Sequence, residues 1–342
     1  MTSISRRQFM AGSVGAATLA AAGWAPSAKA QDVVSLRISS SMPADQNAAH
    51  YAWFQKFEEL IKANLGDRVH LDYFPNSQLG SEADVAQQVK VGSVDLMVSG
   101  SSIWGTIVPE IGMLDLGYVF DSFDHAEKAL DSGAADALNK IVNDATGVSF
   151  LGWGFSFGAR NVYTKKEVKS LADLKDVKLR VLPAPAFIQT FQLMGAIPTP
   201  IAINELYTAL QTGVVDGFEH DAGTVLAQKF YEITKFGFLT QHLFSPIVAA
   251  IGKNGMSKIT DDIRPAFMKA AADATAHQRE VAVSTANAAI EKLKGLGVAY
   301  TPMPDADRKG IQGQVADALY KPFAEKYPAT KPVFDLIASA RG

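Results

Sequence analysis

The sequence predicts an α/β protein built from two similar lobes that share one long helix. Strand-like and helix-like segments alternate along residues 33–98, which is typical of a parallel sheet covered by helices. The same helix–Gly–x–Val–Asp junction occurs at Gly92 and again at Gly213, which indicates two similar lobes. An Ala-rich helical run fills residues 266–296. Because that run is too long for one compact lobe, we expect it to extend along both.

Length and composition exclude several classes of protein. The chain has 342 residues, of which 48% are hydrophobic and 20% are charged, enough for one large or two medium domains. It contains no cysteine, so disulfides, thiolate metal sites, iron–sulfur clusters and cysteine nucleophiles are excluded. The formal net charge of −3 gives no support for nucleic-acid binding, which needs a basic surface.

The first thirty residues have the order of a secretory signal. Arg6 and Arg7 precede an apolar, Gly- and Ala-rich run at residues 11–23, and Ala28-Lys29-Ala30 forms a small-x-small cleavage site. We expect a Tat signal peptide at residues 1–30, cleaved after about Ala30, rather than an anchor, because a spanning helix needs ~20 strongly apolar residues. The mature chain would then be periplasmic and not membrane-spanning, with 29 basic against 35 acidic residues.

Short strands alternate with amphipathic helices in the first half of the mature chain. Trp53, Phe54 and Phe57 share one face of the first helix, as expected for a helix packed on a core. Gly92 ends the second helix, where a left-handed residue is favourable. In order, we expect a strand at residues 33–39, a helix at 47–64, a strand at 69–73, a helix at 82–90 and a strand at 94–98.

The second half is expected to repeat this arrangement before a helical C-terminal region. Asn204 is placed to cap a helix that Gly213 ends. We expect strands at 148–157 and 178–182, a short helix at 169–174, a helix at 205–211, a strand from 214, and helices at 266–296 and 305–327. The first lobe would comprise residues 31–157 plus about 246–285, and the second lobe residues 158–245 plus about 286–342.

The sequence gives little support for an enzyme. It contains no HExxH and no GxxxxGK[ST], the patterns of zinc proteases and P-loop proteins. GFSFG at residues 154–158 has the GxSxG spacing, but it lies in a strand-like segment rather than at the strand-to-helix turn of a serine-hydrolase elbow. Glu219, His220 and Asp221 form the one dense acid–histidine cluster. Adjacent side chains point in different directions, so these three do not converge on one metal ion or substrate. We expect no catalytic activity, no metal and no cofactor, with an enzyme that uses this cluster as the alternative.

Two arginines are candidates for binding an anion. Arg180 lies in an otherwise apolar strand at residues 177–181, and a buried guanidinium must find an anion. Its planar fork fits a carboxylate with two charge-assisted hydrogen bonds. A salt bridge to Asp173 or Asp176 is the alternative for Arg180. For Arg160, nearer a strand end, a structural salt bridge is the favoured interpretation.

The segment from Lys175 to Phe236 resembles the signature region of DctP-type solute-binding proteins of tripartite ATP-independent periplasmic (TRAP) transporters. The run at residues 205–216 is the most specific match, and the resemblance covers nearly the whole mature chain. The matching pieces are DLK at 173–175, KLRV at 178–181, GAIPTP at 195–200, ELYTALQTG at 205–213, VDG at 215–217, QKFYE at 228–232, FPNSQLG at 74–80 and GSVD at 92–95.

The resemblance implies a periplasmic receptor with the two-lobed periplasmic binding protein-like fold. A small organic acid would lie between the lobes, its carboxylate held by Arg180 with help from Arg160. The family pattern after Val-Asp-Gly is x-Glu-Asn-Pro, whereas this sequence has Phe218-Glu219-His220-Asp221. His220 therefore stands where family members place a ligand-binding Asn. Its ring nitrogens donate or accept according to protonation.

We expect a hydroxylated acid, such as an aldonate or uronate, because the pocket candidates are hydrogen-bonding groups. Delivery to TRAP membrane subunits is the expected role, and a receptor for a sensor kinase is a second alternative. Some relatives bind a cation with the acid, but none is required. The substrate-binding candidates are Arg180, Arg160, His220, Glu219, Ser40, Ser101 and Ser102, with Trp104 and Phe187 as walls.

Overall fold

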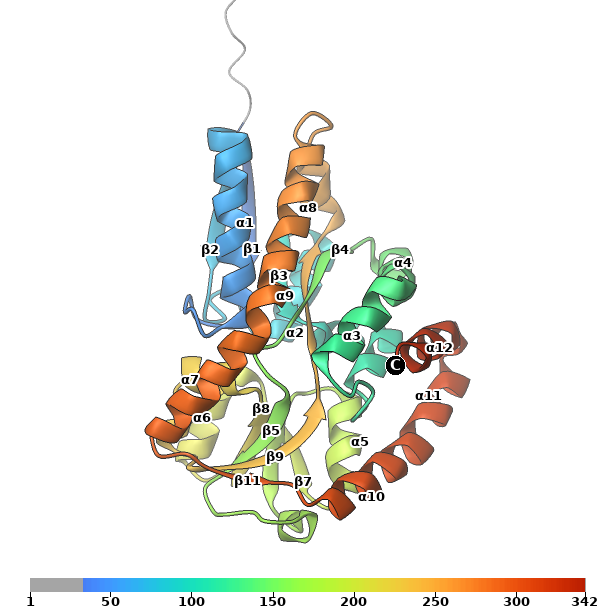
Figure 1. Ribbon diagram of the computed structural model, residues 1–342. Helices are drawn as coiled ribbons and strands as arrows, with labels where there is room; N and C mark the ends of the chain where they lie inside the picture. Colours follow the sequence, from blue (N-terminus) through green and yellow to red (C-terminus); the bar gives the residue numbers. More distant parts are fainter. Residues whose placement is uncertain (1–32, 342) are drawn as a thin grey trace, which may run out of the picture. The chain divides into compact units, whose positions relative to one another are not determined.

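The computed structural model describes residues 33–341, and the predicted export signal at residues 1–30 lies outside them. The described residues form two sheets (Figure 1). One has the strand order β2-β1-β3-β10-β4 and the other β11-β9-β5-β8-β6-β7. The predicted two-lobed α/β class is confirmed.

The first sheet is mixed rather than purely parallel. β1 runs parallel to β2 and β3, but β10 is antiparallel to both β3 and β4. The expectation of a parallel sheet was therefore wrong at this edge. β10 enters from the second sheet and runs in the opposite direction, which no local pattern reveals. The strands are β1 (Val34–Ser39), β2 (Val69–Phe74), β3 (Leu96–Gly100), β4 (Ser149–Phe155) and β10 (Pro246–Ile251).

The helices of the first lobe bury the aromatic face that the sequence predicted. Trp53 stacks on Phe57 with ring centres 4.7 Å apart, and Phe57 meets Phe267 edge to face at 5.3 Å. The helices are α1 (Ala49–Leu65), α2 (Glu82–Val91), α3 (Phe123–Ala129), α4 (Ala135–Thr146) and α8 (Lys253–Lys258). Two 3₁₀ segments, Ser101–Thr106 and Pro109–Asp115, follow β3.

The second sheet is also mixed. β6 pairs in parallel with β7 and β8, whereas β5 is antiparallel to β8 and β9. The strands are β5 (Arg160–Thr164), β6 (Lys178–Val181), β7 (Ile197–Pro200), β8 (Gly217–His220), β9 (Phe236–Leu243) and β11 (Ala299–Pro302). The helices are α5 (Pro185–Leu193), α6 (Ile203–Gln211) and α7 (Ala222–Ala227), with a short 3₁₀ turn at Leu171–Leu174.

The repeated glycine junction is confirmed, with two corrections to its second copy. Gly92 and Gly213 both adopt positive φ, 85° and 77°, where glycine has no steric penalty. Asn204, however, is not the cap of α6: Ala202 holds that position, and Asn204 lies inside the first turn. The strand that follows begins at Gly217 rather than at residue 214.

One helix, α9 (Arg264–Gly295), contacts both lobes as predicted. It packs on α1 and β4 of the first lobe and on α7 of the second (Figure 1). Close packing on β4 requires glycine, because a Cβ at Gly152 would lie 1.9 Å from Thr275 Oγ1 and one at Gly154 2.2 Å from Gln278 Oε1.

Two extended crossings join the lobes beside this helix. One links β4 to β5 and the other links β9 to β10. They are hydrogen-bonded to each other, since Ser156 N–H donates to the Ser245 carbonyl at 3.0 Å. Paired crossings with a shared helix are the connections expected of hinge closure.

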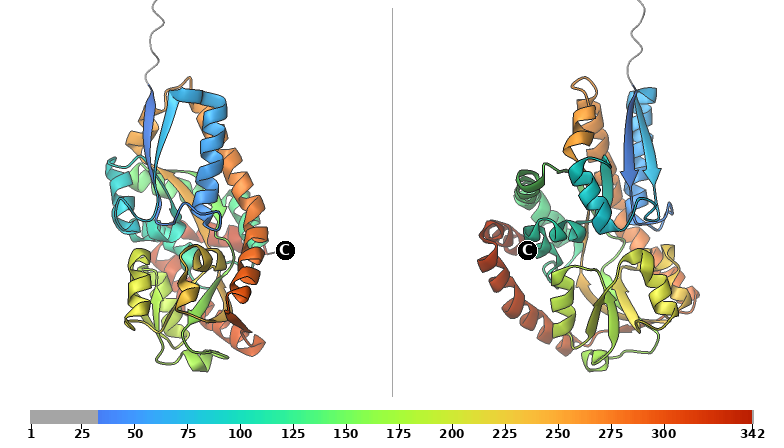
Figure 2. Two further views of the ribbon diagram at one scale, coloured as in Figure 1. Left: turned by 90° about the vertical axis from the view of Figure 1, so that its left-hand side faces the viewer. Right: turned by 180° about the vertical axis from the view of Figure 1, so that it is seen from behind.

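The C-terminal region is longer and more broken than expected. The expected single helix at 305–327 consists of α10 (Asp305–Val315), a π-helical turn at Ala316–Tyr320 and α11 (Lys321–Lys326). A further helix, α12 (Lys331–Ser339), contacts α3 (Figure 2). We propose the lobe boundaries given above with α12 assigned to the first lobe. Within residues 33–341 no helix combines the length and apolar character that crossing a membrane requires.

Candidate functional site

A small cavity lies where the two lobes and their crossings meet. Its volume is about 40 Å³, room for about three water molecules. Both lobes contribute polar side chains to it. The lining residues are Met42, Ala49, His50, Glu82, Gly100 and Ser102 from the first lobe, Arg160, Leu182, His220, Asp221 and Thr224 from the second, and Ser156, Ser245, Pro246 and Ile247 at the crossings.

Arg180 has a buried guanidinium with an open hydrogen-bonding position. It is 1% exposed, its Nε donates to the Ile201 carbonyl at 2.7 Å, and its Nη1 has no partner among the described residues. Burial lowers the pKa of Arg180 to about 10, with Glu219 opposing that shift. Neither Asp173 nor Asp176 forms a salt bridge with it in the described structure. The side chain lies near the cavity without being part of its lining.

Arg160, in contrast, is paired with a protein carboxylate. Its Nε and Nη2 donate to the two carboxylate oxygens of Glu219 at 2.6 and 2.7 Å. Burial works against both charges, but each holds the other ionised: the pKa of Glu219 is held well below its ordinary value and that of Arg160 is raised. The guanidinium carbon also lies 5.1 Å from the centre of the Phe187 ring. Phe187 thus supports Arg160 from the core, with 0% of its surface exposed.

His242 completes the pairing of Glu219. Its Nε2 lies 3.2 Å from Glu219 Oε2, and its Nδ1 lies 2.9 Å from the Thr240 hydroxyl. Burial lowers the pKa of His242, so the neutral ring donates through Nε2 and accepts through Nδ1. Glu219 is therefore occupied by two protein groups and has 0% exposure.

Asp221 is the N-cap of α7, which explains why an acid follows His220. Asp221 Oδ1 accepts from the Thr224 backbone N–H at 2.9 Å, and Oδ2 accepts from the Thr224 hydroxyl at 3.0 Å. His220 Nδ1 lies 2.8 Å from Asp221 Oδ2. Burial lowers the pKa of His220, and the Arg160 charge adds to that effect. Glu219 is thus paired with Arg160 and His242, whereas His220 and Asp221 are paired with each other.

The first lobe contributes a histidine and a carboxylate that the sequence analysis did not select. His50 Nδ1 lies 3.0 Å from the Ser40 hydroxyl, and burial lowers the pKa of His50 to about 4. Glu82, the first residue of α2, accepts from the Ser41 hydroxyl at 2.8 Å. Burial raises the pKa of Glu82, while Ser41 and the charges of Arg180 and Arg160 oppose the shift.

The remaining candidates differ in their surroundings. Ser102 lines the cavity and donates to Asp115. Ser101 does not line it, and its hydroxyl is buried without a partner among the described residues. Trp104 packs in the core with 0% exposure, and its indole N–H donates to Ser99 at 3.2 Å. Its contacts are those of a core residue and do not favour a role as a ligand wall.

The sequence indicated the arginines, but their different surroundings come only from the structure. Arg160 and Glu219 are 59 positions apart in the chain, so no local pattern links them. The role of Asp221 could have been predicted, because an Asp three residues before Thr224 is typical of a helix N-cap that accepts from the Thr224 backbone N–H. The sequence around Glu82 predicted only the start of a helix, and nothing in it indicated that the side chain lines the cavity. Among residues 33–341 no three acidic or histidine side chains gather to hold a metal ion.

The chain resembles known solute-binding proteins in sequence. Residues 39–326 match the model of the family described as "Bacterial extracellular solute-binding protein, family 7". The 2,3-diketo-L-gulonate-binding periplasmic protein YiaO of Escherichia coli is 30% identical over 80% of this chain and 83% of its own length.

Solved structures agree. A TRAP periplasmic solute-binding protein of Pseudomonas putida with bound D-glucuronate has a TM-score of 0.81 and 28% identity, covering 90% of this chain and 98% of that one. A TRAP periplasmic solute-binding protein of Polaromonas bound to D-erythronate also has a TM-score of 0.81 and 28% identity, covering 90% of this chain and 98% of that one. The galactonate complex of the sugar acid binding protein of Advenella mimigardefordensis has a TM-score of 0.84 and 25% identity, covering 90% and 99%.

Proposed function

Since this chain belongs to family 7 of the bacterial extracellular solute-binding proteins, we propose that it is a non-catalytic TRAP receptor for a hydroxylated monocarboxylic acid of the sugar-acid class. The acid binds between the lobes, and the loaded receptor delivers it to the membrane subunits. The relatives support this class, because the Pseudomonas and Polaromonas proteins carry D-glucuronate and D-erythronate.

The open guanidinium of Arg180 is the observation that carries the proposal. A buried cation with an unpaired N–H is unfavourable, and a carboxylate supplies both the charge and the acceptor that it lacks. Arg160 also lines the cavity, but its Nε and Nη2 are already bonded to Glu219. We therefore assign the ligand carboxylate to Arg180 and give Arg160 a positioning role beside it.

Hydrogen-bond acceptors from the first lobe favour hydroxyl groups on the rest of the ligand. Ser102 uses its hydroxyl hydrogen on Asp115, so its lone pairs are left to accept. Glu82 presents a carboxylate from the first lobe. A ligand hydroxyl satisfies both acceptors, whereas a second ligand carboxylate meets a like charge at Glu82. His220 and His50 complete the polar wall.

Ligand binding requires the lobes to move. A cavity of about 40 Å³ has no room for a sugar acid, so the ligand enters an open form whose lobes separate about the two crossings and α9. Contacts from both lobes then favour the closed form, because a ligand shifts such an equilibrium by its differential affinity.

The acid–histidine cluster does not favour the enzyme alternative. Glu219 is engaged by Arg160 and His242, and Asp221 by Thr224 and the start of α7. His220 is paired with Asp221, whose carboxylate also caps α7, so the pair has a structural role at the start of that helix. Export by the Tat route through residues 1–30 remains part of the proposal, as does the periplasmic location.

Thermal unfolding of the mature protein, refolded from denaturant to remove carried ligand, tests the proposal. D-glucuronate, D-galactonate, D-erythronate, pyruvate and succinate are compared. A ligand at 100 times its Kd adds about 2.7 kcal/mol, a shift of a few degrees. We expect D-glucuronate, D-galactonate or D-erythronate to raise the unfolding temperature by a few degrees. No shift with any of them would contradict the proposal.

A further inference from the structure

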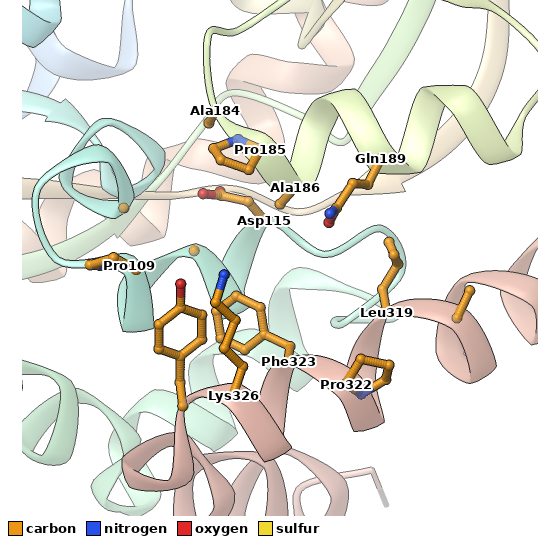
Figure 3. A pocket seen from close by; sticks show the side chains of 14 residues that line it. Pro109, Asp115, Ala184, Pro185, Ala186, Gln189, Leu319, Pro322, Phe323 and Lys326 are labelled. Atoms are coloured by element: carbon orange, nitrogen blue, oxygen red, sulfur yellow. The ribbon is translucent and has the colours of Figure 1, made fainter.

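A second, larger cavity lies beside the first, and the proposed function does not use it. Its volume is about 210 Å³, against about 40 Å³ for the cavity near Arg180. Three parts of the chain form its walls: the 3₁₀ segment Pro109–Asp115, the start of α5, and the C-terminal segment around α11 (Figure 3).

The walls of this cavity combine apolar surface with one buried carboxyl group. Pro185, Leu319, Pro322 and Phe323 supply the apolar surface. Figure 3 shows the Asp115 side chain between Pro185 on one side and Phe323 and Lys326 on the other. Such a combination, an apolar wall with few placed polar groups, is typical of small-molecule sites.

Asp115 is the polar group without an ordinary structural explanation. It is 1% exposed; Oδ1 accepts from Ser102, whereas Oδ2 has no hydrogen-bond partner among residues 33–341. No salt bridge joins it to a cation in that part of the chain, because the nearby Arg160 is taken by Glu219. Burial raises the pKa of Asp115 to about 7. An unmade hydrogen bond at a buried carboxyl oxygen is unfavourable, and each such case calls for an explanation.

We propose that this cavity is a second ligand site, distinct from the acid site, which takes a small amphipathic amine. The ammonium group donates to Asp115 Oδ2, and a ring or branched hydrocarbon body packs on Pro185, Leu319 and Phe323. A cation fits because the carboxylate is buried without one. The size fits as well, since an apolar cavity of about 150 Å³ holds benzene.

Lys326 sets the polarity of the mouth. It is exposed, and its ammonium lies 5.2 Å from the centre of the Tyr327 ring. A cationic mouth and an anionic interior orient an amine with its charged end inward. Ser102 lines the first cavity and donates to Asp115 of the second, so the two sites share a wall without sharing a ligand.

Benzylamine is the probe that tests this site. We measure its binding by calorimetry at pH 8, where Asp115 is ionised, to the mature protein and to the isosteric variant Asp115→Asn. The wild type is expected to bind with a Kd on the order of 1 mM, as for a weak fragment, and Asp115→Asn at least tenfold more weakly. Benzyl alcohol and benzoate are the matched ligands, and both are expected to bind more weakly than benzylamine.

A cavity-filling variant and a crystal structure make the outcome decisive. Leu319→Trp is expected to abolish benzylamine binding while thermal unfolding stays cooperative. Crystals of the wild type grown with benzylamine are expected to place its nitrogen at Asp115. Equal affinity for Asp115→Asn, no saturable binding to the wild type, or a benzylamine located elsewhere would overturn the proposal. None of these outcomes depends on whether the protein binds sugar acids.

Discussion

Arg160 and Arg180 lie on two strands of one sheet, on either side of β8, yet their surroundings are opposite. Arg160 has both oxygens of Glu219 within 2.7 Å, whereas Arg180 Nη1 has no partner in the described residues. Both side chains are almost fully buried. Burial alone therefore does not distinguish a structural arginine from a ligand-binding one. We propose that the pairing of the guanidinium does, since Arg160 has a protein carboxylate and Arg180 has none in the described residues.

Two titratable groups of the first lobe, His50 and Glu82, differ in the same way: one is bonded within the protein and the other has room for a further partner. His50 is satisfied inside the protein by Ser40, as Arg160 is by Glu219. Glu82 accepts one bond from Ser41 and faces the cavity. We therefore propose that Arg180 and Glu82 bind the ligand, whereas Arg160 and His50, which also line the cavity, are bonded to protein partners and hold its shape.

The largest expected effect is the loss of stability in Arg160→Met. This change leaves the Glu219 carboxylate buried without its guanidinium, which lowers the free energy of unfolding by about 3–5 kcal/mol. Denaturant unfolding measures it. Adding Glu219→Leu removes the stranded charge and is expected to restore most of the loss. A single variant as stable as the wild type would show that Arg160 is not structural.

Protonation of His50 is expected to lower the free energy of unfolding by about 2 kcal/mol between pH 7 and pH 5. Its folded pKa of about 4 lies below the unfolded value near 6.5. Below pH 6.5 the unfolded chain binds a proton that the folded one does not, so stability falls as the pH falls. We expect His50→Asn to lose less stability over this range. Parallel curves for the two proteins would contradict the prediction.

Glu82→Gln is expected to change selectivity by about tenfold, as for one charge-assisted hydrogen bond. D-gluconate and D-glucarate differ only in a terminal hydroxymethyl or carboxylate, so the ratio of their affinities reports on Glu82. The wild type should prefer gluconate, and the variant should narrow that preference. Glu59→Gln, at an exposed carboxylate of α1, is the matched control. If the ratio of gluconate to glucarate affinity stayed the same in Glu82→Gln, Glu82 would not contact the ligand.

Arg180→Met is expected to have the smallest effect on the ligand-free protein. No protein carboxylate forms an ion pair with Arg180 in the described structure, so its removal leaves none without an ion-pair partner. The free energy of unfolding should stay within about 1 kcal/mol of the wild type or rise. A loss as large as that of Arg160→Met would erase the difference between the two arginines.

The sequence predicted the parts of this molecule that depend on local patterns. Alternating residues placed β1 and β2, apolar spacing placed α1, and glycines marked the ends of α2 and α6. Arg180 was found because a guanidinium in an apolar strand is locally anomalous. The repeated glycine junction predicted two lobes and the family resemblance agreed with it, and the structure confirms them.

What the sequence could not predict depends on contacts between distant residues. β10 joins the first sheet from residue 246, after the chain has crossed to the second lobe. Arg160 finds Glu219 across two strands, and Glu219 finds His242 on a third. Phe187 and Trp104 were placed beside the ligand because aromatic side chains wall many sites, but both are in the core. Asp115 gave no local signal, since its partner Ser102 lies in a separate 3₁₀ segment.

Calorimetric titration of D-glucuronate into the wild type, Arg180→Met and Arg180→Lys tests the central claim most directly. The methionine variant, folded and as stable as the wild type, should bind at least about 30-fold more weakly, as expected when a buried charge pair loses one partner. The lysine variant, which keeps the charge without the planar fork, should fall between the two. Binding of D-glucuronate to Arg180→Met with wild-type affinity would contradict the account.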